Sequence, residues 1–181
     1  ESIDVTFWLE FVEKGLVAGG GSTNGEGFVA LRDFDSGEKI WRTGLAKDDS
    51  FFSNFSTHGV VFSAGGDYVA THTPQGLVYL LDQADGLIYW KATTNYTDEI
   101  HGAAPLAFVP ATETTPAFLA VSQGGVGYTR SYFHAFSLSG NIQWKHLMYS
   151  PARFTHGIRL PDGRPAATVV TTLGVYTFAF E

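Results

Sequence analysis

Cysteine is absent from this chain of 181 residues, which excludes a disulfide scaffold and a thiolate metal site. Positive charge is scarce as well: 11 lysines and arginines against 18 aspartates and glutamates leave a net charge of −7. We therefore expect no nucleic-acid partner and no attraction to anionic membranes. No apolar stretch approaches the ~20 residues that span a bilayer, so we expect no membrane span. The polar opening Glu1–Asp4 is unlike a signal peptide and is typical of a mature or trimmed chain.

The composition favours an all-β protein instead. Charged residues make up 16% of the chain, below the average of about 25%, whereas aromatic residues make up 15%. The 21 glycines are accompanied by many β-branched residues and few helix-forming runs. The length suffices for one domain with a proper core. We therefore expect a single all-β domain that is rich in turns.

A segment that ends in tryptophan occurs three times. It reads LRDFDSGEKIW at residues 31–41 and LLDQADGLIYW at residues 80–90, and a copy one residue shorter, AFSLSGNIQW, occupies residues 135–144. The tryptophans Trp41, Trp90 and Trp144 fall 49 and 54 residues apart. This spacing is close to the length of one four-stranded propeller blade, so the repeat predicts a β-propeller.

Each copy of the repeat has the chemistry of a β-hairpin. An apolar strand leads into a short polar turn, where Asp33 or Asp82 can accept hydrogen bonds from backbone amides. A glycine in the turn (Gly37, Gly86 or Gly140) supplies the positive φ that a β-carbon would resist. A second strand then carries the tryptophan. Three copies in register make the hairpin a much stronger prediction than one copy would.

The repeat resembles the tryptophan-docking motif of pyrroloquinoline-quinone-type propellers, which reads Ala-x-Asp-x-x-Thr-Gly-Lys-x-x-Trp. Aspartate, glycine and tryptophan are retained in the first two copies, whereas Ser137 replaces the aspartate in the third. The resemblance implies that each indole packs against a neighbouring blade and holds the ring together. Ordinary core aromatics are the alternative, since they also bury a large apolar area. The residues to which the resemblance gives a structural docking role are Trp41, Trp90, Trp144, Asp33, Asp82, Gly37, Gly86 and Gly140.

Strand-like runs precede each hairpin and predict four blade-like units, at approximately residues 1–45, 46–94, 95–148 and 149–181, of which the last is incomplete. Residues 1–12 allow two interpretations. They supply the strand that the last blade lacks, or they form the inner strand of the first blade. The predicted architecture is accordingly a small closed ring or part of a larger propeller, which a second chain or another copy completes. Uncovered blade edges would otherwise invite association.

A His-Gly pair recurs at the start of the innermost strand of three units, at His58, His101 and His156. Equivalent positions in successive blades lie on a circle about the central axis, so the three imidazoles could converge at one mouth of the channel. Imidazoles bind zinc, copper or iron, and three of them with a water form an open site. The alternative is a plain turn that enters each blade. The other histidines share no such register and are predicted to be incidental: His72, His134 and His146.

Quinoprotein dehydrogenases share this repeat, but the resemblance covers only the docking scaffold. Those enzymes resemble one another further in an acidic calcium site and, in many alcohol dehydrogenases, in a vicinal cysteine pair. This chain has no cysteine and about half of the usual eight blades. Asp98 and Glu99 beside His101 offer carboxylates to calcium, although a solvated loop is the favoured explanation. We predict no organic cofactor, and a metal ion only through the three histidines.

Two functions are compatible with these observations. The first is a non-catalytic, extracytoplasmic propeller that binds a protein or a glycan through its loops, because several short-repeat relatives of the quinoproteins are assembly scaffolds. The second is an enzyme, or part of one, that uses the histidine ring with a metal or an anionic ligand. We favour the first, since the chain contains no nucleophile elbow and no metalloprotease His-Glu motif. Glycosylation-type triplets at Asn54 and Asn95 agree with a secreted location.

Overall fold

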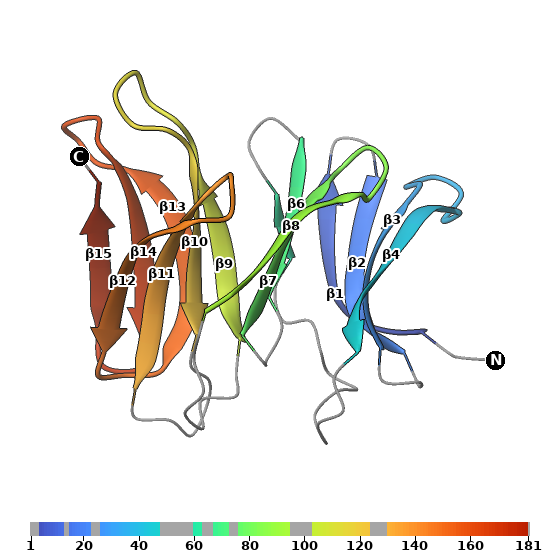
Figure 1. The fold of residues 1–181 in the computed structure, drawn as a ribbon, viewed down its shortest axis with the longest axis horizontal. Coiled ribbons are helices and arrows are strands. Elements are labelled where there is room, and N and C mark those ends of the chain that lie inside the picture. Colours follow the sequence, from blue (N-terminus) through green and yellow to red (C-terminus); the bar gives the residue numbers. More distant parts are fainter. Residues whose placement is uncertain are drawn as a thin grey trace.

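The computed structural model describes residues 4–12, 15–22, 26–47, 60–62, 67–72, 76–94, 103–123 and 130–180. In these ranges the chain forms fifteen β-strands and no helix, and the strands make four separate antiparallel sheets. Within the same ranges there is therefore no helix long and apolar enough to cross a membrane. The sheets stand side by side in a row, as Figure 1 shows.

Each sheet is a simple meander in chain order. Sheet 1 contains β1 (Asp4–Val12), β2 (Gly15–Ser22), β3 (Glu26–Arg32) and β4 (Lys39–Lys47). Sheet 2 contains β5 (Val60–Phe62), β6 (Tyr68–His72), β7 (Leu77–Asp82) and β8 (Ile88–Thr93). Sheet 3 contains β9 (Ala103–Val109), β10 (Phe118–Gln123), β11 (Ser131–Ser137) and β12 (Ile142–Met148). Sheet 4 contains β13 (Ala152–Arg159), β14 (Pro165–Thr171) and β15 (Val175–Ala179).

The first strands of consecutive sheets lie next to one another, because β5 contacts both β1 and β9, and β9 contacts β13. These strands therefore form the inner side of the row, and β4, β8 and β12 form its outer side. This is the blade arrangement of a β-propeller, and the predicted fold class, with about four blades in the chain, is confirmed.

The two interpretations of residues 1–12 are resolved by the pairing of β1. This strand is the inner strand of sheet 1, where it pairs with β2 in register from Asp4 opposite Ser22 to Val12 opposite Gly15. Sheet 4 lies at the other end of the row (Figure 1). The interpretation that residues 1–12 complete the last blade is therefore wrong, since a strand cannot pair at both ends of the row.

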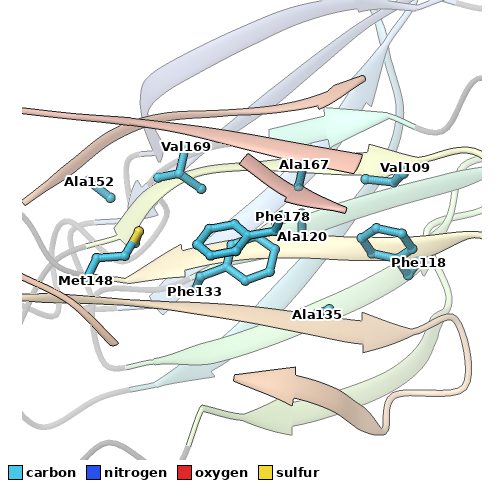
Figure 2. Close-up of a cluster of buried hydrophobic side chains, with 10 residues drawn as sticks. All are labelled: Val109, Phe118, Ala120, Phe133, Ala135, Met148, Ala152, Ala167, Val169 and Phe178. Carbon is cyan, nitrogen blue, oxygen red and sulfur yellow. The ribbon is translucent and has the colours of Figure 1, made fainter. Parts of the chain in front are cut away.

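Three buried clusters hold the row together, one at each boundary between sheets. The cluster between sheets 1 and 2 is formed by Val17, Val29, Leu31, Trp41, Leu45, Val69, Tyr79 and Leu81. The cluster between sheets 2 and 3 is formed by Ala70, Val78, Leu80, Leu106, Leu119, Val121 and Phe136. The cluster between sheets 3 and 4, drawn in Figure 2, includes Phe133 from β11 stacked on Phe178 from β15 at a ring distance of 4.2 Å. The hydrophobic core of the molecule is thus divided among the three boundaries between sheets.

The third strand of sheet 2, β7, is apolar on both faces because sheets 1 and 3 cover it from both sides. In β7, Tyr79 and Leu81 point to sheet 1, whereas Val78 and Leu80 point to sheet 3. This double burial explains the uninterrupted apolar run at residues 77–81, which a strand with one solvated face would break by alternation.

Buried polar contacts also cross the boundaries. Thr94 of sheet 2 donates its hydroxyl to the Gln123 side chain of sheet 3 at 2.5 Å. Thr155 of sheet 4 donates to the hydroxyl of Ser122 in sheet 3 at 2.8 Å. Each pairing satisfies polar groups that would otherwise be costly to bury, and it fixes the register of one sheet against the next.

Candidate protein-binding surface

The hairpin turns of the repeat are built as their sequence suggests. In the first turn, one carboxylate oxygen of Asp33 accepts hydrogen bonds from the backbone N–H groups of Asp35 and Ser36, at 3.1 and 2.8 Å, and from the Ser36 hydroxyl. The bonds from Ser36 hold the pKa of the Asp33 carboxyl below its usual value. In the second turn, Asp82 accepts the Ala84 N–H at 2.6 Å. These contacts use the aspartate as a local acceptor, which closes the turn.

The glycines of the three turns adopt the left-handed backbone conformation. The φ angles of Gly37, Gly86 and Gly140 are 70°, 76° and 88°. In the third turn, Ser137 stands at the aspartate position, and its hydroxyl accepts the backbone N–H of Asn141 at 3.2 Å. The serine hydroxyl therefore replaces the aspartate as the hydrogen-bond acceptor of the turn, at the position where the repeat departs from its pattern.

A β-bulge precedes each tryptophan, and sequence reasoning did not find it. The outer strand carries one extra residue against its partner, namely Ile40, Tyr89 or Gln143. The bulge brings each indole opposite a residue of the third strand, so that Trp41 lies opposite Leu31, Trp90 opposite Leu80 and Trp144 opposite Ala135. Bulges redirect side chains and increase local twist, so this irregularity aims each indole beyond its own sheet.

The Trp41 indole reaches from sheet 1 into the hairpin turn of sheet 2. Its ring N–H donates to the backbone carbonyl of Gln83 at 2.9 Å, and its side chain is only 8% exposed. The ring lies so close to Gly86 that a β-carbon there would be 2.6 Å from the indole. The neighbouring Thr43 hydroxyl donates to the Gly86 carbonyl at 2.6 Å. Only a glycine leaves room for this contact.

The Trp90 indole makes the corresponding contact one sheet further along. Its ring N–H donates to the Leu138 carbonyl at 2.8 Å, and the ring stacks on Phe136 at 5.9 Å with an interplanar angle of 20°. A β-carbon at Gly140 would lie 3.0 Å from the indole. The structure thus brings Trp41 together with Gly86, and Trp90 together with Gly140. That these contacts stabilise the association of the sheets remains a prediction.

Trp144 is different, because 40% of it is exposed. Its ring contacts Phe178 at 5.1 Å and Phe180 at 6.0 Å, both edge to face, and stacks on His146 at 5.5 Å. No turn of the described residues covers it as the turns of sheets 2 and 3 cover the other two indoles. A cavity of about 220 Å³ lies nearby between sheets 3 and 4, and its lining includes Ser137, Gln143 and Phe180.

The strand beside this cavity is also uncovered. Whereas β3, β7 and β11 are almost entirely buried, β15 is mostly exposed, and Val175 reaches 63%. Among the described residues, β15 pairs only with β14. We call Trp144, Phe178, Phe180 and the strand β15 the open edge. It is the candidate binding surface, and sequence reasoning did not distinguish Trp144 from the other two tryptophans.

The predicted histidine ring is only partly described. His58 and His101 lie outside the described residues, as do Asp98, Glu99, Asn54 and Asn95. His156 lies on β13, is exposed, and stacks on Phe154 at 6.4 Å. In the part of the chain that the structure describes, no group of three or more histidine, cysteine, aspartate or glutamate side chains is placed to hold a metal ion. The ring therefore stays a prediction.

A histidine that the sequence suggested was incidental is fully buried. His134 lies on β11 with its ring 6.3 Å from Tyr132 and 6.1 Å from Phe136. Neither ring nitrogen has a hydrogen-bond partner among the described residues. Burial, and to a lesser extent the positive charge of Lys145, lower the pKa of His134 to about 4. The alternation of Tyr132, His134 and Phe136 in a strand buried on both faces was the signal that could have revealed it.

The chain is similar to known propellers in sequence and in structure. It is 33% identical over 70 residues to outer membrane protein assembly factor BamB of Yersinia pestis, a match that covers 36% of this chain and 17% of that protein. The crystal structure of BamB from Moraxella catarrhalis superimposes with a TM-score of 0.56 at 17% identity, covering 96% of this chain and 42% of that chain. The β-propeller domain of Cps50 (Swd1) from Myceliophteria thermophila gives a TM-score of 0.63 at 12% identity, with 98% and 55% coverage.

These matches differ in what they establish. At identities of 12% and 17% the structural likeness shows the fold alone. The chain also spans less than half of the Moraxella catarrhalis protein, and the matched region is a smaller share still of the Yersinia pestis protein. The sequence match to the family is broader, since the family model described as outer membrane protein assembly factor BamB covers residues 25–169. The chain therefore belongs to this family of pyrroloquinoline-quinone-type β-propeller repeat proteins.

Proposed function

We propose that this chain acts as a protein-binding scaffold in the assembly of outer membrane proteins, and that it works outside the cytoplasm. The family to which it belongs is named for outer membrane protein assembly, which supports this role and this location. The observation that carries the proposal is the match of the family model to residues 25–169. Within the described residues, the indole of Trp144 is 40% exposed, whereas the corresponding indole of Trp41 in sheet 1 is 8% exposed.

The chemistry of the open edge fits a protein better than a glycan. An exposed tryptophan beside a small cavity is a typical anchor in protein interfaces, where tryptophan, tyrosine and arginine are enriched among the residues that dominate binding. The proposal assigns the chain no reaction and no cofactor.

A binding experiment with a matched control tests the proposal. The purified chain would be immobilised and exposed to purified outer membrane protein assembly complex from a bacterial strain that lacks BamB. We expect binding that weakens at least about tenfold in Trp144→Ala, because truncating a tryptophan anchor commonly has an effect of this size. The control is Phe34→Ala, since Phe34 is 65% exposed in the β3–β4 turn of sheet 1, near the other end of the row.

The possible results separate clearly. Retention of the complex by wild-type chain and Phe34→Ala, with loss in Trp144→Ala, supports both the function and the surface. Failure of the wild-type chain to retain any component of the complex would show that the proposed function is wrong. Equal weakening by both substitutions would show that binding does not depend on the open edge.

A further inference from the structure

We infer that the β7–β8 hairpin of sheet 2 binds an arginine side chain of a partner protein, between the exposed ring of Tyr89 and the carboxylates of Asp82 and Asp85. This inference deepens the proposed function and rests on it for the identity of the partner, because it specifies the chemistry of a second contact that the scaffold makes. Sheet 2 has a neighbouring sheet on each side, so its hairpin is exposed although both boundaries of the sheet are filled (Figure 1).

Three consecutive large side chains of this hairpin are exposed. Leu87, Ile88 and Tyr89 are 67%, 42% and 55% exposed, although the next residue, Trp90, is docked on sheet 3. An exposed run of this kind is typical of a surface that contacts another molecule.

The Tyr89 ring is held in place from two directions. It meets the ring of Tyr68 on β6 edge to face at 5.5 Å, and Tyr68 in turn stacks on Phe108 of β9 at 6.4 Å with an interplanar angle of 27°. The Tyr89 hydroxyl donates to the Asp82 carboxylate at 2.6 Å. A ring that is fixed in this way and is still exposed offers a preorganised face to a ligand, because little side-chain entropy is lost on binding.

Negative charge surrounds this ring. Asp82 accepts the Tyr89 hydroxyl, and Asp85 lies in the same turn, where one of its carboxylate oxygens accepts a backbone N–H at 2.9 Å. The hydrogen bond to Asp82 raises the pKa of Tyr89 to about 12, and the charges of Asp82 and Asp85 add to this effect. Asp67 is close to the turn as well, since its carbonyl accepts the Gln83 N–H at 3.0 Å. Neither Asp67 nor Asp85 forms an ion pair with another described residue.

Only one of the three repeat hairpins has this combination. At the bulge position of Tyr89, sheet 1 has Ile40 and sheet 3 has Gln143. At the position of Asp82, sheet 3 has Ser137. The hairpins of sheets 1 and 3 form without a tyrosine beside two carboxylates, so the fold does not require this arrangement. Recognition of a ligand accounts for it.

The chemistry of the hairpin defines the occupant. An aromatic face attracts a cation, and carboxylates at its border accept the N–H groups of that cation. A guanidinium is planar enough to stack on the ring, and its fork of N–H groups matches a carboxylate better than an ammonium does. The net charge of −7 favours the approach of a basic partner. An arginine side chain therefore fits the hairpin, whereas an acidic segment would be repelled.

Titration with a small arginine derivative tests the site in the absence of the partner. The probe is N-acetyl-arginine amide, and its control is N-acetyl-citrulline amide, which has nearly the same shape and no charge. Proton–nitrogen correlation spectra of the nitrogen-15-labelled full chain at low salt follow the backbone signals of residues 82–91. We expect saturable shifts of these signals with the arginine derivative and none with the citrulline derivative. Affinity should fall about threefold in Tyr89→Ile and in Asp85→Asn, as is usual for exposed cation–π and ionic contacts.

The repeat provides matched controls. Ile40 shows that the bulge position accepts isoleucine, so we expect Tyr89→Ile to keep the hairpin. Asp35→Asn removes the same charge from the exposed turn of sheet 1 and should keep the wild-type affinity for the arginine derivative. When the chains are immobilised and exposed to the assembly complex, Tyr89→Ile should retain the complex about threefold more weakly than Asp35→Asn does.

Other results would overturn the inference. These are absence of saturable shifts, equal shifts with the citrulline derivative, or retention of the assembly complex that is unchanged in both Tyr89→Ile and Asp85→Asn. Shifts of the same signals by N-acetylglucosamine and not by the arginine derivative would make the occupant a glycan. Selective arginine binding by a wild-type chain that does not retain the complex would refute the proposed function and leave the arginine site standing.

Discussion

At the scale of single residues, Gly37 and Gly86 occupy the same position of the same turn with φ angles of 70° and 76°, but their surroundings differ. The position of a β-carbon at Gly37 has nothing within 4 Å among the described residues, whereas at Gly86 it lies 2.6 Å from the Trp41 ring. We expect Gly37→Ala to cost about 1–2 kcal/mol, the usual penalty of a left-handed alanine. Gly86→Ala should cost a further 1–3 kcal/mol or so, because the indole must move.

Urea unfolding of the two variants measures the difference. The backbone strain is common to both substitutions, so the excess cost of Gly86→Ala reports the contact with Trp41 and Thr43 of sheet 1. Equal destabilisation would mean that the indole yields without loss, and that it does not lock sheet 1 onto sheet 2.

His134 makes a second prediction at this scale. Burial lowers its pKa in the folded chain to about 4, whereas the unfolded chain keeps the ordinary value of 6.5. As pH falls through 6.5 the unfolded chain takes up the proton first, so the stability conferred by a neutral His134 is complete above pH 6.5 and is lost between pH 6.5 and 4. The loss should approach about 3 kcal/mol, at 1.36 kcal/mol per pKa unit.

Denaturant unfolding at pH 7 and at pH 4.5 checks this pH dependence in wild-type chain, His134→Leu and His156→Gln. His134→Leu should lose much of the pH dependence, because the buried site no longer titrates. His156 is exposed, so His156→Gln should keep the wild-type dependence. A wild-type slope in His134→Leu would assign the acid sensitivity to other groups.

At the scale of elements, Trp41 and Trp90 each connect the outer strand of one sheet to the hairpin turn of the next. Trp90→Ala removes the stack on Phe136 and leaves the Leu138 carbonyl without its indole donor. We expect a loss of about 3–5 kcal/mol in the free energy of unfolding, as for other large aromatic truncations. Trp144→Ala should cost clearly less, since its ring is 40% exposed. A loss below about 1 kcal/mol for Trp90→Ala would contradict a docking role.

The hairpins were predictable because their turn chemistry is local. Aspartate, glycine and the apolar run before them lie within a few residues of each other, and the sequence alone therefore indicated the strands around Asp82 and Gly86. The bulges at Ile40, Tyr89 and Gln143 were not predictable, because a bulge depends on how two strands pair and leaves no composition signal.

At the scale of the whole molecule, the arrangement of the sheets was predictable and the accessibility of the sites was not. The spacing of Trp41, Trp90 and Trp144 indicated one blade per repeat, which the sheets bear out. The repeat made the three tryptophans equivalent, yet Trp144 is exposed because accessibility depends on what the following sheet provides. His134 was missed for a similar reason, since its burial comes from packing between sheets and not from its neighbours in the chain.

The histidine ring is a prediction at the same scale, because His58, His101 and His156 would have to meet across sheets 2, 3 and 4. If they bind a metal, the purified chain should hold close to one equivalent of zinc, copper or iron by elemental analysis. The triple substitution of these histidines by alanine should abolish the bound metal. Less than about a tenth of an equivalent in the wild-type chain would rule out the metal site, because a tight three-histidine site would be close to fully occupied.

The direction of the indole contacts has a consequence for any larger assembly. Each indole points forward along the row, from one sheet to the next in chain order, so the row has polarity and its two ends are unlike. Within the described residues, Trp144 near one end is exposed, and Gly37 near the other has open space around it. A contact that continues this series of indole contacts is head to tail, which is the heterologous kind of contact that closes into a ring or grows into a filament.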